Sequence, residues 1–271
     1  MTRAAPPINI RSGAQMREYR AMVARIASDR PGHVLDWGAG FGQVTCLLAD
    51  AGLRVTALDY RPEIEREGYH EQPLFPDVQV YVTHDPVRLP FADGTYDAVL
   101  SAGVLEHVEH PDRSLDEIRR VLVPGGRLYI YKLPNRFSYV EKLLKLLGLP
   151  HHGNHGPYDV LYTRPSAYRL LERHGFRVVE FRRANVLPLL RVGARVPRAA
   201  PALWALNRAL SRVPGLNLVA TNLELVAESA RSSPGLRGDD DPRDRVPQER
   251  GVDRAAADDD VSGRVAALEV D

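Results

Sequence analysis

The chain has 271 residues, which is enough for one α/β domain of ordinary size and additional segments. A formal net charge of +1, a sequence pI of about 7.9 and the lack of any run of Lys and Arg argue against a nucleic-acid partner. Cys46 is the only cysteine, so intrachain disulfides are excluded. The sequence has no apolar N-terminal segment and no apolar run of 18 residues, and we therefore expect a cytoplasmic location.

The first predicted element is an amphipathic helix from about Ser12 to Ser28, within an N-terminal segment of residues 1–30. Apolar side chains recur at helical intervals, and arginines occupy other parts of the helix surface. The apolar positions are Met16, Tyr19, Met22, Val23 and Ile26. We expect this helix to precede the first strand of a larger domain.

Residues 33–51 are predicted to form a strand, a tight turn and a helix. The apolar strand stops at Asp36, glycines follow at every second position, and apolar residues then recur at helical spacing. The glycines are Gly38, Gly40 and Gly42. Because glycine has no Cβ, the backbone there can turn sharply, approach a ligand closely and present amide donors at a helix N-terminus. This pattern predicts a site for a nucleotide-bearing cofactor.

The spacing of residues around this turn distinguishes between cofactors. A dinucleotide fingerprint requires a third small residue at position 43, which is Gln43, so a nicotinamide oxidoreductase is disfavoured. Asp36 is a poor neighbour for a pyrophosphate and a suitable one for a ligand with an ammonium and a sulfonium group. Asp59 lies near the end of the predicted strand Arg54–Tyr60, 21 positions after the first glycine, where a carboxylate can accept both ribose hydroxyls. Tyr60 would then pack against the adenine.

Further strands are predicted over residues 78–83, 96–101, 127–133 and 218–227, and a turn at Pro124, Gly125 and Gly126 precedes the third of these. Asp85 follows the first of them in a proline-bounded loop, where its carboxylate either accepts from the adenine amino group or caps the turn at Pro86. The alternation of strands and helices indicates parallel pairing with right-handed crossovers, and ligands then bind at the carboxyl ends of the strands. Side chains at such ends include Asp36, Asp59, Asp85 and Ser101.

Four motifs in a fixed order carry a resemblance to a known family. They are DWGAGFG at residues 36–42, LPFADGTYD at 89–97, VLEHV at 104–108 and LVPGGRL at 122–128. Over about residues 32–134 the chain resembles the class I S-adenosylmethionine-dependent methyltransferases. The resemblance implies a Rossmann-like, doubly wound α/β fold. Its seven-stranded sheet is mostly parallel with an antiparallel last strand, and helices cover both faces. The resemblance also implies S-adenosylmethionine as the cofactor and methyl transfer as the reaction.

The resemblance implies a set of cofactor contacts. Asp36 would lie near the ammonium group of the methionine part, and Asp59 would hold the ribose. The other contacts are Gly38, Ala39, Gly40 and Ser101 for the methionine part, and Tyr60, Asp85 and Pro86 for the adenine. In this family the N-terminal helix often closes over the cofactor, so Tyr19 or Arg17 would reach its carboxylate. The alternative is a helix that only covers the edge of the sheet.

His107 is the candidate catalytic residue, because it follows the fourth strand and, by the resemblance, lies near the methyl group. It would act as a general base for a hydroxyl acceptor, although a histidine there can also cap a helix or bond Glu106. One branch of the family holds a metal with Glu-x-x-Glu-His, and the first of these ligands is missing here. A metal is therefore not expected. The loop with His151, His152 and His155 is interpreted as a mobile loop at the mouth of the site.

The methyltransferase domain is predicted to span residues 31–228, with insertions at 135–162 and 184–217. The second insertion is apolar with scattered arginines. It is interpreted as a lid over the domain, with peripheral membrane contact or a dimer contact as alternatives. Residues 229–271 carry acidic clusters and mixed charge and have no aromatic residue, so a disordered tail is predicted.

We expect methyl transfer to a small-molecule or lipid-linked acceptor, by a monomer or a homodimer. Oxygen is the expected acceptor atom, with nitrogen and carbon left open. The rival function is a noncatalytic scaffold or binding protein that retains the fold. Cofactor positions in register weaken this rival, because a scaffold has no need for Asp36, Gly38, Gly40 and Asp59 together.

Overall fold

The computed structural model describes residues 12–60, 80–148, 158–187 and 197–230. A seven-stranded sheet runs through them in the order β3-β2-β1-β4-β5-β7-β6. The strands are β1 (His33–Trp37), β2 (Arg54–Tyr60), β3 (Val80–Thr83), β4 (Tyr96–Ala102), β5 (Leu122–Pro134), β6 (Phe176–Ala184) and β7 (Asn222–Ser229). Strands β1 to β5 pair in parallel, and β7 is antiparallel to both β5 and β6. The predicted sheet is confirmed.

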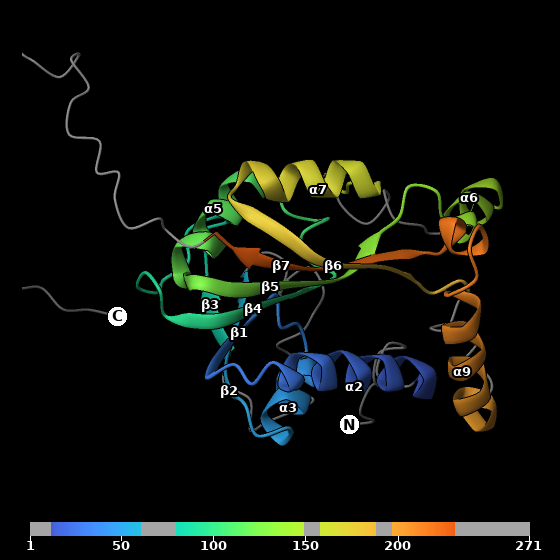
Figure 1. The fold of residues 1–271 in the computed structure, drawn as a ribbon, viewed down its shortest axis with the longest axis horizontal. Coiled ribbons are helices and arrows are strands. Elements are labelled where there is room, and N and C mark those ends of the chain that lie inside the picture. The colour runs from blue at the N-terminus through green and yellow to red at the C-terminus, as the bar shows by residue number, and fades with distance from the viewer. Residues whose placement is uncertain (1–11, 61–79, 149–157, 188–196, 231–271) are drawn as a thin grey trace, which may run out of the picture. The chain divides into compact units, whose positions relative to one another are not determined.

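Helices cover both faces of this sheet (Figure 1). Helices α2 (Gly13–Ser28) and α3 (Gln43–Asp50) lie on one face, and α5 (Pro111–Val121) and α7 (Arg164–Arg173) lie on the other. The remaining helices lie at the edge of the sheet where β5 ends. They are α6 (Tyr139–Leu146), α9 (Ala200–Leu210) and the short helices η1 (Pro197–Ala199) and η2 (Leu216–Val219). This arrangement is a doubly wound, Rossmann-like fold, as predicted.

Each face of the sheet has its own apolar core. Leu115 and Ile118 recur on one side of α5 and pack with Leu128 of β5 on one face. On the opposite face, Met22 and Ile26 of α2 pack with residues of β1, β5 and β7. Successive strand residues point to opposite faces, so a single strand such as β5 contributes to both cores.

Two element boundaries differ from the predictions. Strand β5 begins at Leu122 rather than Arg127, because α5 ends at Val121 and Leu122 already pairs with Tyr96 of β4. The last strand begins at Asn222 rather than Leu218, because residues 216–219 form the short helix η2.

The two predicted insertions contain helices α6 and α9, at the carboxyl end of β5. The Asn135 side-chain amide donates to the carbonyls of Leu218 (2.9 Å) and Ala220 (2.7 Å), so it joins the start of the first insertion to the end of the second. The loop with the three histidines and residues 231–271 of the predicted tail lie outside the described residues. Within the described part of the chain, no helix is long and apolar enough to cross a membrane.

The contribution of this core can be tested with a pair of leucines on helices. Leu115 is 0% exposed and Leu146 on α6 is 82% exposed. Leu115→Ala should lower the free energy of unfolding by about 2–5 kcal/mol, because it leaves a cavity between α5 and the sheet. Leu146→Ala should change it by no more than about 0.5 kcal/mol. Urea unfolding of both variants measures the difference, and equal losses would contradict the packing described here.

Candidate active site

The turn between β1 and α3 is shaped by its glycines. Gly38, Gly40 and Gly42 have φ values of 79°, 55° and 79°, a region that other residues rarely adopt. The amides of Gly38 and Ala39 donate to the carbonyl of Leu58 on β2, at 2.8 and 3.1 Å. A Cβ on Gly38 would lie 2.3 Å from a methyl carbon of Val104, just after β4. The turn therefore needs glycine at position 38 and is fastened to both neighbouring strands.

Asp59 joins the same turn to the end of β2. One carboxylate oxygen accepts from the amide of Gly40 and the other from the amide of Tyr60, each at 2.7 Å. Asp59 is 7% exposed, and Tyr60 beside it is half-buried. Asp59 therefore fixes the position of the glycine turn relative to the end of β2.

Asp36 is a buried acid on β1 near the glycine turn. It is 2% exposed, and one of its oxygens accepts from the hydroxyl of Thr45 at 2.6 Å. The pKa of Asp36 is raised to about 6, chiefly by burial and also by the negative charge of Asp59. The hydrogen bond from Thr45 acts in the opposite direction. Two carboxylates at the ends of β1 and β2 make this part of the site suitable for a ligand with positive charge.

Two buried polar atoms near the turn have no hydrogen-bond partner among the described residues. They are the hydroxyl oxygen of Ser101, on a residue that is 1% exposed, and the amide oxygen of Gln43, on a residue that is 8% exposed. Ser101 lies beside Trp37 in the register of β4 and β1. Buried polar atoms are normally bonded, so these two are available to a ligand. In the sequence, Gln43 was used only to disfavour a dinucleotide cofactor, and its place in the candidate site was not predicted.

The structure places Asp85 at its own turn after β3. One carboxylate oxygen accepts from the amides of Val87 (2.9 Å) and Arg88 (2.8 Å), and these hydrogen bonds hold the pKa of Asp85 below its usual value. Asp85 and Pro86 are both exposed. This is the turn-capping alternative of the two sequence interpretations, and contact with an adenine stays a prediction.

His107 forms a pair with an acid that sequence reasoning missed. Its Nδ1 lies 2.7 Å from a carboxylate oxygen of Asp159, whereas its Nε2 lies 3.8 Å from Glu106, beyond hydrogen-bond distance. The Asp159 side chain is 4% exposed and that of His107 is 28% exposed. The amide of Val160 donates to the Glu106 carbonyl at 3.0 Å and holds the two segments together. A carboxylate on Nδ1 orients the ring and leaves Nε2 available to a substrate.

A metal centre was not expected from the sequence. Across the residues that the structure describes, no group of three or more His, Cys, Asp and Glu is arranged to hold a metal ion. His151, His152 and His155 lie outside these residues.

Comparison with known proteins gives the family. The model of the methyltransferase domain family matches residues 35–130. A demethylmenaquinone methyltransferase of Thermus thermophilus is 31% identical over 170 residues, which are 58% of this chain and 76% of that protein. The sterol 4-C-methyltransferase strm-1 of Caenorhabditis elegans is 33% identical over 152 residues, 55% of this chain and 45% of that protein.

A solved structure shares the fold. It is a SAM-dependent methyltransferase from Thermotoga maritima, with a TM-score of 0.50, 15% identity and coverage of 82% of this chain and 98% of that one. The chain spans between 46% and 66% of the length of the first four curated relatives, which are also named demethylmenaquinone methyltransferases.

The fold, the glycine turn and these matches define an S-adenosylmethionine-dependent methyltransferase of class I. The chain belongs to this family. The prediction of S-adenosylmethionine as the cofactor is confirmed by that membership. The buried acids and the two buried polar atoms without partners fit a cationic sulfonium ligand.

Burial of Asp36 has a measurable effect on stability. Because the folded state holds the Asp36 proton up to about pH 6 and the unfolded chain only to about pH 4, ionised Asp36 destabilises the fold at neutral pH. Asp36→Asn should therefore raise the free energy of unfolding at pH 7 by about 1–3 kcal/mol. The gain should vanish as the pH falls from 6 to 4. Urea unfolding over this range measures it, with the exposed Asp50→Asn as control; a pH-independent gain would contradict the assignment.

Proposed function

We propose that this protein transfers the methyl group of S-adenosylmethionine to a hydroxyl-bearing lipophilic ring, either a small molecule or a lipid-linked one. The observation that carries the proposal is the His107–Asp159 pair, in which His107 lies in the turn after β4 and Asp159 in the segment before α7. Val104 in the same turn packs against the glycine turn at Gly38. The names of the relatives, demethylmenaquinone and sterol methyltransferases, support a lipophilic acceptor.

The cofactor roles follow the positions of the side chains. Asp59 would hold the ribose, and Asp36 would face the ammonium group of the methionine part. The other proposed contacts are Gly38, Ala39, Gly40 and Ser101 for the methionine part, and Tyr60, Asp85 and Pro86 for the adenine. When bound, S-adenosylmethionine supplies an electrophilic methyl group on a positively charged sulfur.

His107 would act as the general base. Its Nε2 takes the proton of the acceptor hydroxyl, and Asp159 stabilises the imidazolium that forms. The acceptor oxygen then forms a bond to the methyl carbon while the carbon–sulfur bond breaks, and the bonding electron pair remains on sulfur. The protein otherwise has to hold the acceptor in line, which contributes up to about 7–11 kcal/mol in favourable cases.

Oxygen remains the proposed acceptor atom, and carbon is the alternative. Removal of a proton from a ring hydroxyl increases the electron density on the oxygen and on the adjacent ring carbons, so the same base serves both reactions. The name of the sterol relative states a carbon acceptor. A methylated product that retains every hydroxyl group of the acceptor would overturn the oxygen assignment and establish carbon.

The test of the proposed function is release of S-adenosylhomocysteine with demethylmenaquinol as the acceptor probe. His107→Ala should lower turnover about 10²–10⁴-fold and leave the affinity for S-adenosylmethionine unchanged. The remaining activity should rise with pH as the acceptor ionises without a base. Asp159→Asn should show the same pattern to a smaller extent, and His110→Ala, a nearby histidine, is the matched control. Cofactor binding without turnover would support the noncatalytic scaffold instead.

We further propose that the second insertion contacts a membrane surface, which is one of the alternatives to a lid given by the sequence. Helix α9 packs on α2 through Ala200, Leu203 and Trp204, which also suits the lid interpretation. Apolar side chains nearby remain exposed: Leu206, Val213, Leu216 and Leu218 around the insertion, and Leu143, Leu146 and Leu147 around α6. Exposed Lys142 and Lys145 on α6 supply positive charge for anionic lipids. The cytoplasmic location and the monomeric or dimeric state stay predictions.

Membrane contact can be tested by co-sedimentation with phosphatidylcholine vesicles that contain phosphatidylglycerol. The double variant Leu146→Glu with Leu216→Glu should lose binding, because both charges would enter the lipid interface. Tyr81→Glu, an exposed apolar residue on β3, is the control and should bind as the unmodified protein does. If the double variant still sediments with vesicles, the proposed membrane surface is wrong. If the double variant instead loses the mass of a dimer, the surface is a dimer contact.

A further inference from the structure

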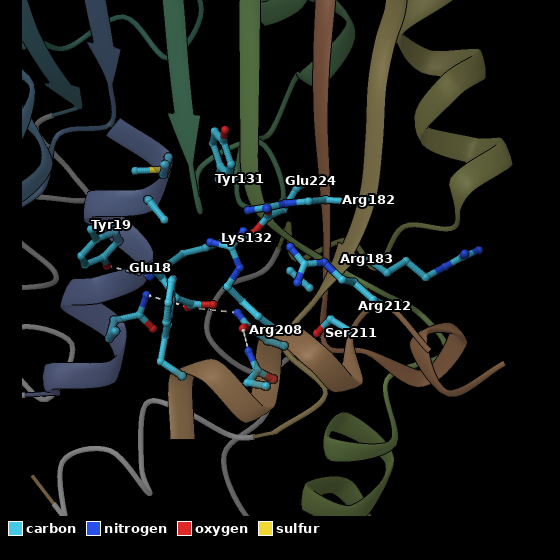
Figure 2. Close-up of a pocket in the computed structure, with 17 residues that line it drawn as sticks. Glu18, Tyr19, Tyr131, Lys132, Arg182, Arg183, Arg208, Ser211, Arg212 and Glu224 are labelled. Atoms are coloured by element: carbon cyan, nitrogen blue, oxygen red, sulfur yellow. Dashed lines mark hydrogen bonds and ion pairs between the residues drawn. The ribbon is translucent and has the colours of Figure 1, made fainter. Parts of the chain in front are cut away.

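A cavity of about 110 Å³ lies between α2 and α9, beside the ends of β5, β6 and β7 (Figure 2). The proposed base and the cofactor contacts proposed at the strand ends do not line it, whereas Tyr19, an alternative contact for the cofactor carboxylate, does. Its wall contains aromatic and apolar groups such as Tyr19, Met22, Tyr131 and Trp204, together with several charged side chains. A site with an apolar wall and a few convergent polar groups has the usual character of a ligand pocket.

Three cations of the wall form no ion pair with a carboxylate of the described residues. Lys132 donates to the Tyr19 hydroxyl at 2.6 Å and lies 4.2 Å from the centre of its ring. Arg208 stacks over a tryptophan ring at 4.9 Å, and Arg212 is solvent-exposed at the mouth. In the described ranges, no carboxylate forms an ion pair with any of these three cations. Their charge is therefore available to an anion.

The acids of the wall offset only part of this positive charge, although Lys132 attracts both Glu18 and Glu224. Arg182 and Glu224 pair with each other across β6 and β7. Glu18 accepts from the side-chain amides of Gln15 and Asn185, at 3.2 and 3.1 Å. Burial raises the pKa of Glu18 to about 7, with a further contribution from Glu224, so Glu18 carries only part of a negative charge at neutral pH.

The backbone is strained at two residues of the wall. Lys132 and Asn185 have φ values of 62° and 68°, and Arg30 is the one other non-glycine residue with positive φ in the described chain. The register of β5 and β7 shifts between Ile130 and Leu133, so Lys132 lies on an irregularity that redirects its side chain. Strained non-glycine residues cluster at ligand sites, where the surrounding structure holds them.

A hydrogen-bond chain fixes the second strained residue. The Asn207 side chain of α9 donates to that of Asn185 at 2.8 Å, and Asn185 in turn donates to Glu18 of α2. The end of β6 therefore ties the two helices that form the walls of the cavity. The cavity is a built feature, and not a gap between mobile helices.

The cavity lies close to the turn that holds the base. Gly103 follows β4, and its amide donates to the Tyr131 carbonyl at 3.0 Å. A Cβ on Gly103 would lie 4.0 Å from side-chain carbons of Lys132 and 3.7 Å from a carboxylate oxygen of Glu106. Glu106 directly precedes His107 in the chain. Lys132 and Glu106 of the base turn therefore both lie within about 4 Å of one position beside Gly103.

We propose that this cavity binds a negatively charged oxygen group of the methyl acceptor, a phosphate or a carboxylate, through Lys132, Arg208 and Arg212. The proposal rests on the proposed methyl transfer and names the chemical class of its acceptor. An anion held by these cations would place an attached ring at Gly103, next to His107. An acceptor without such a group, such as the neutral demethylmenaquinol probe, would bind more weakly than an anionic acceptor with the same ring.

Three probes of one shape test this proposal by calorimetric titration in the presence of S-adenosylhomocysteine. They are 4-hydroxyphenyl phosphate, 4-hydroxybenzoate and hydroquinone, which share the ring and one hydroxyl and differ in the opposite group. The phosphate or the carboxylate should bind at least about tenfold more tightly than hydroquinone. The tighter of the two anionic probes shows whether the cavity prefers a phosphate or a carboxylate. Inorganic phosphate should compete with both probes for the cavity.

Substitutions of the three cations test which residues hold the anionic group. Arg208→Gln and Arg212→Gln should each reduce the preference for the anionic probe about three- to tenfold and leave hydroquinone unchanged. Lys132→Gln should do the same, and the two arginine variants keep the test valid if the strained Lys132 position tolerates no change. Arg164→Gln is the matched control, because Arg164 stacks on Phe181, 4.9 Å from its ring centre, and does not line the cavity.

Equal binding of the three probes, no binding of any of them, or an equal loss in Arg164→Gln would overturn the anion site. Failure of the proposed function is recognised separately, since the unmodified protein would then release no S-adenosylhomocysteine from S-adenosylmethionine in the turnover assay. The anion preference can fail while binding at the glycine turn persists.

Discussion

The hydrogen bonds between the glycine turn and the end of β2 are the constraint on which the site depends. The amides of Gly38 and Ala39 share the carbonyl of Leu58, and the amide of Gly40 reaches the carboxylate of Asp59. These contacts set the distance between β1 and β2 at their carboxyl ends, where a ligand of the fold binds. The same contacts require positive φ values, which only glycine adopts without strain, so the spacing of the glycines and the position of Asp59 are parts of one geometric requirement.

Local patterns in the sequence predicted this part of the protein well. The glycine turn, the acid at the end of β2 and the alternation of strands and helices depend on residues close together in the chain, and the structure contains each of them. The His107–Asp159 pair joins residues 52 positions apart, and the contact between Lys132 and Tyr19 joins residues 113 positions apart. No periodicity or spacing indicates such pairs, because the crossovers of the sheet bring them together.

Two predictions failed at boundaries for a related reason. Proline and glycine after α5 suggested a turn before the next strand, yet Leu122 already pairs with β4. Apolar residues 216–219 suggested the last strand, yet they form η2 beside the side chain of Asn135. In both cases a long-range contact decided the local conformation. The two interpretations of Asp85 also differ in range. The turn cap requires only the amides of neighbouring residues, whereas adenine contact requires a bound ligand.

The residues matched by the family model end at position 130, two positions before Lys132. Every residue assigned to the cofactor falls inside that matched range, and every residue that lines the cavity between α2 and α9 falls outside it. The residues assigned to the cofactor and the residues that line the cavity therefore come from separate stretches of the chain. Substitutions in α2, β6 or α9 can remodel the cavity without touching the glycine turn. Such a division lets one cofactor scaffold diversify in acceptor choice through changes in the flanking segments, at little cost to the core reaction.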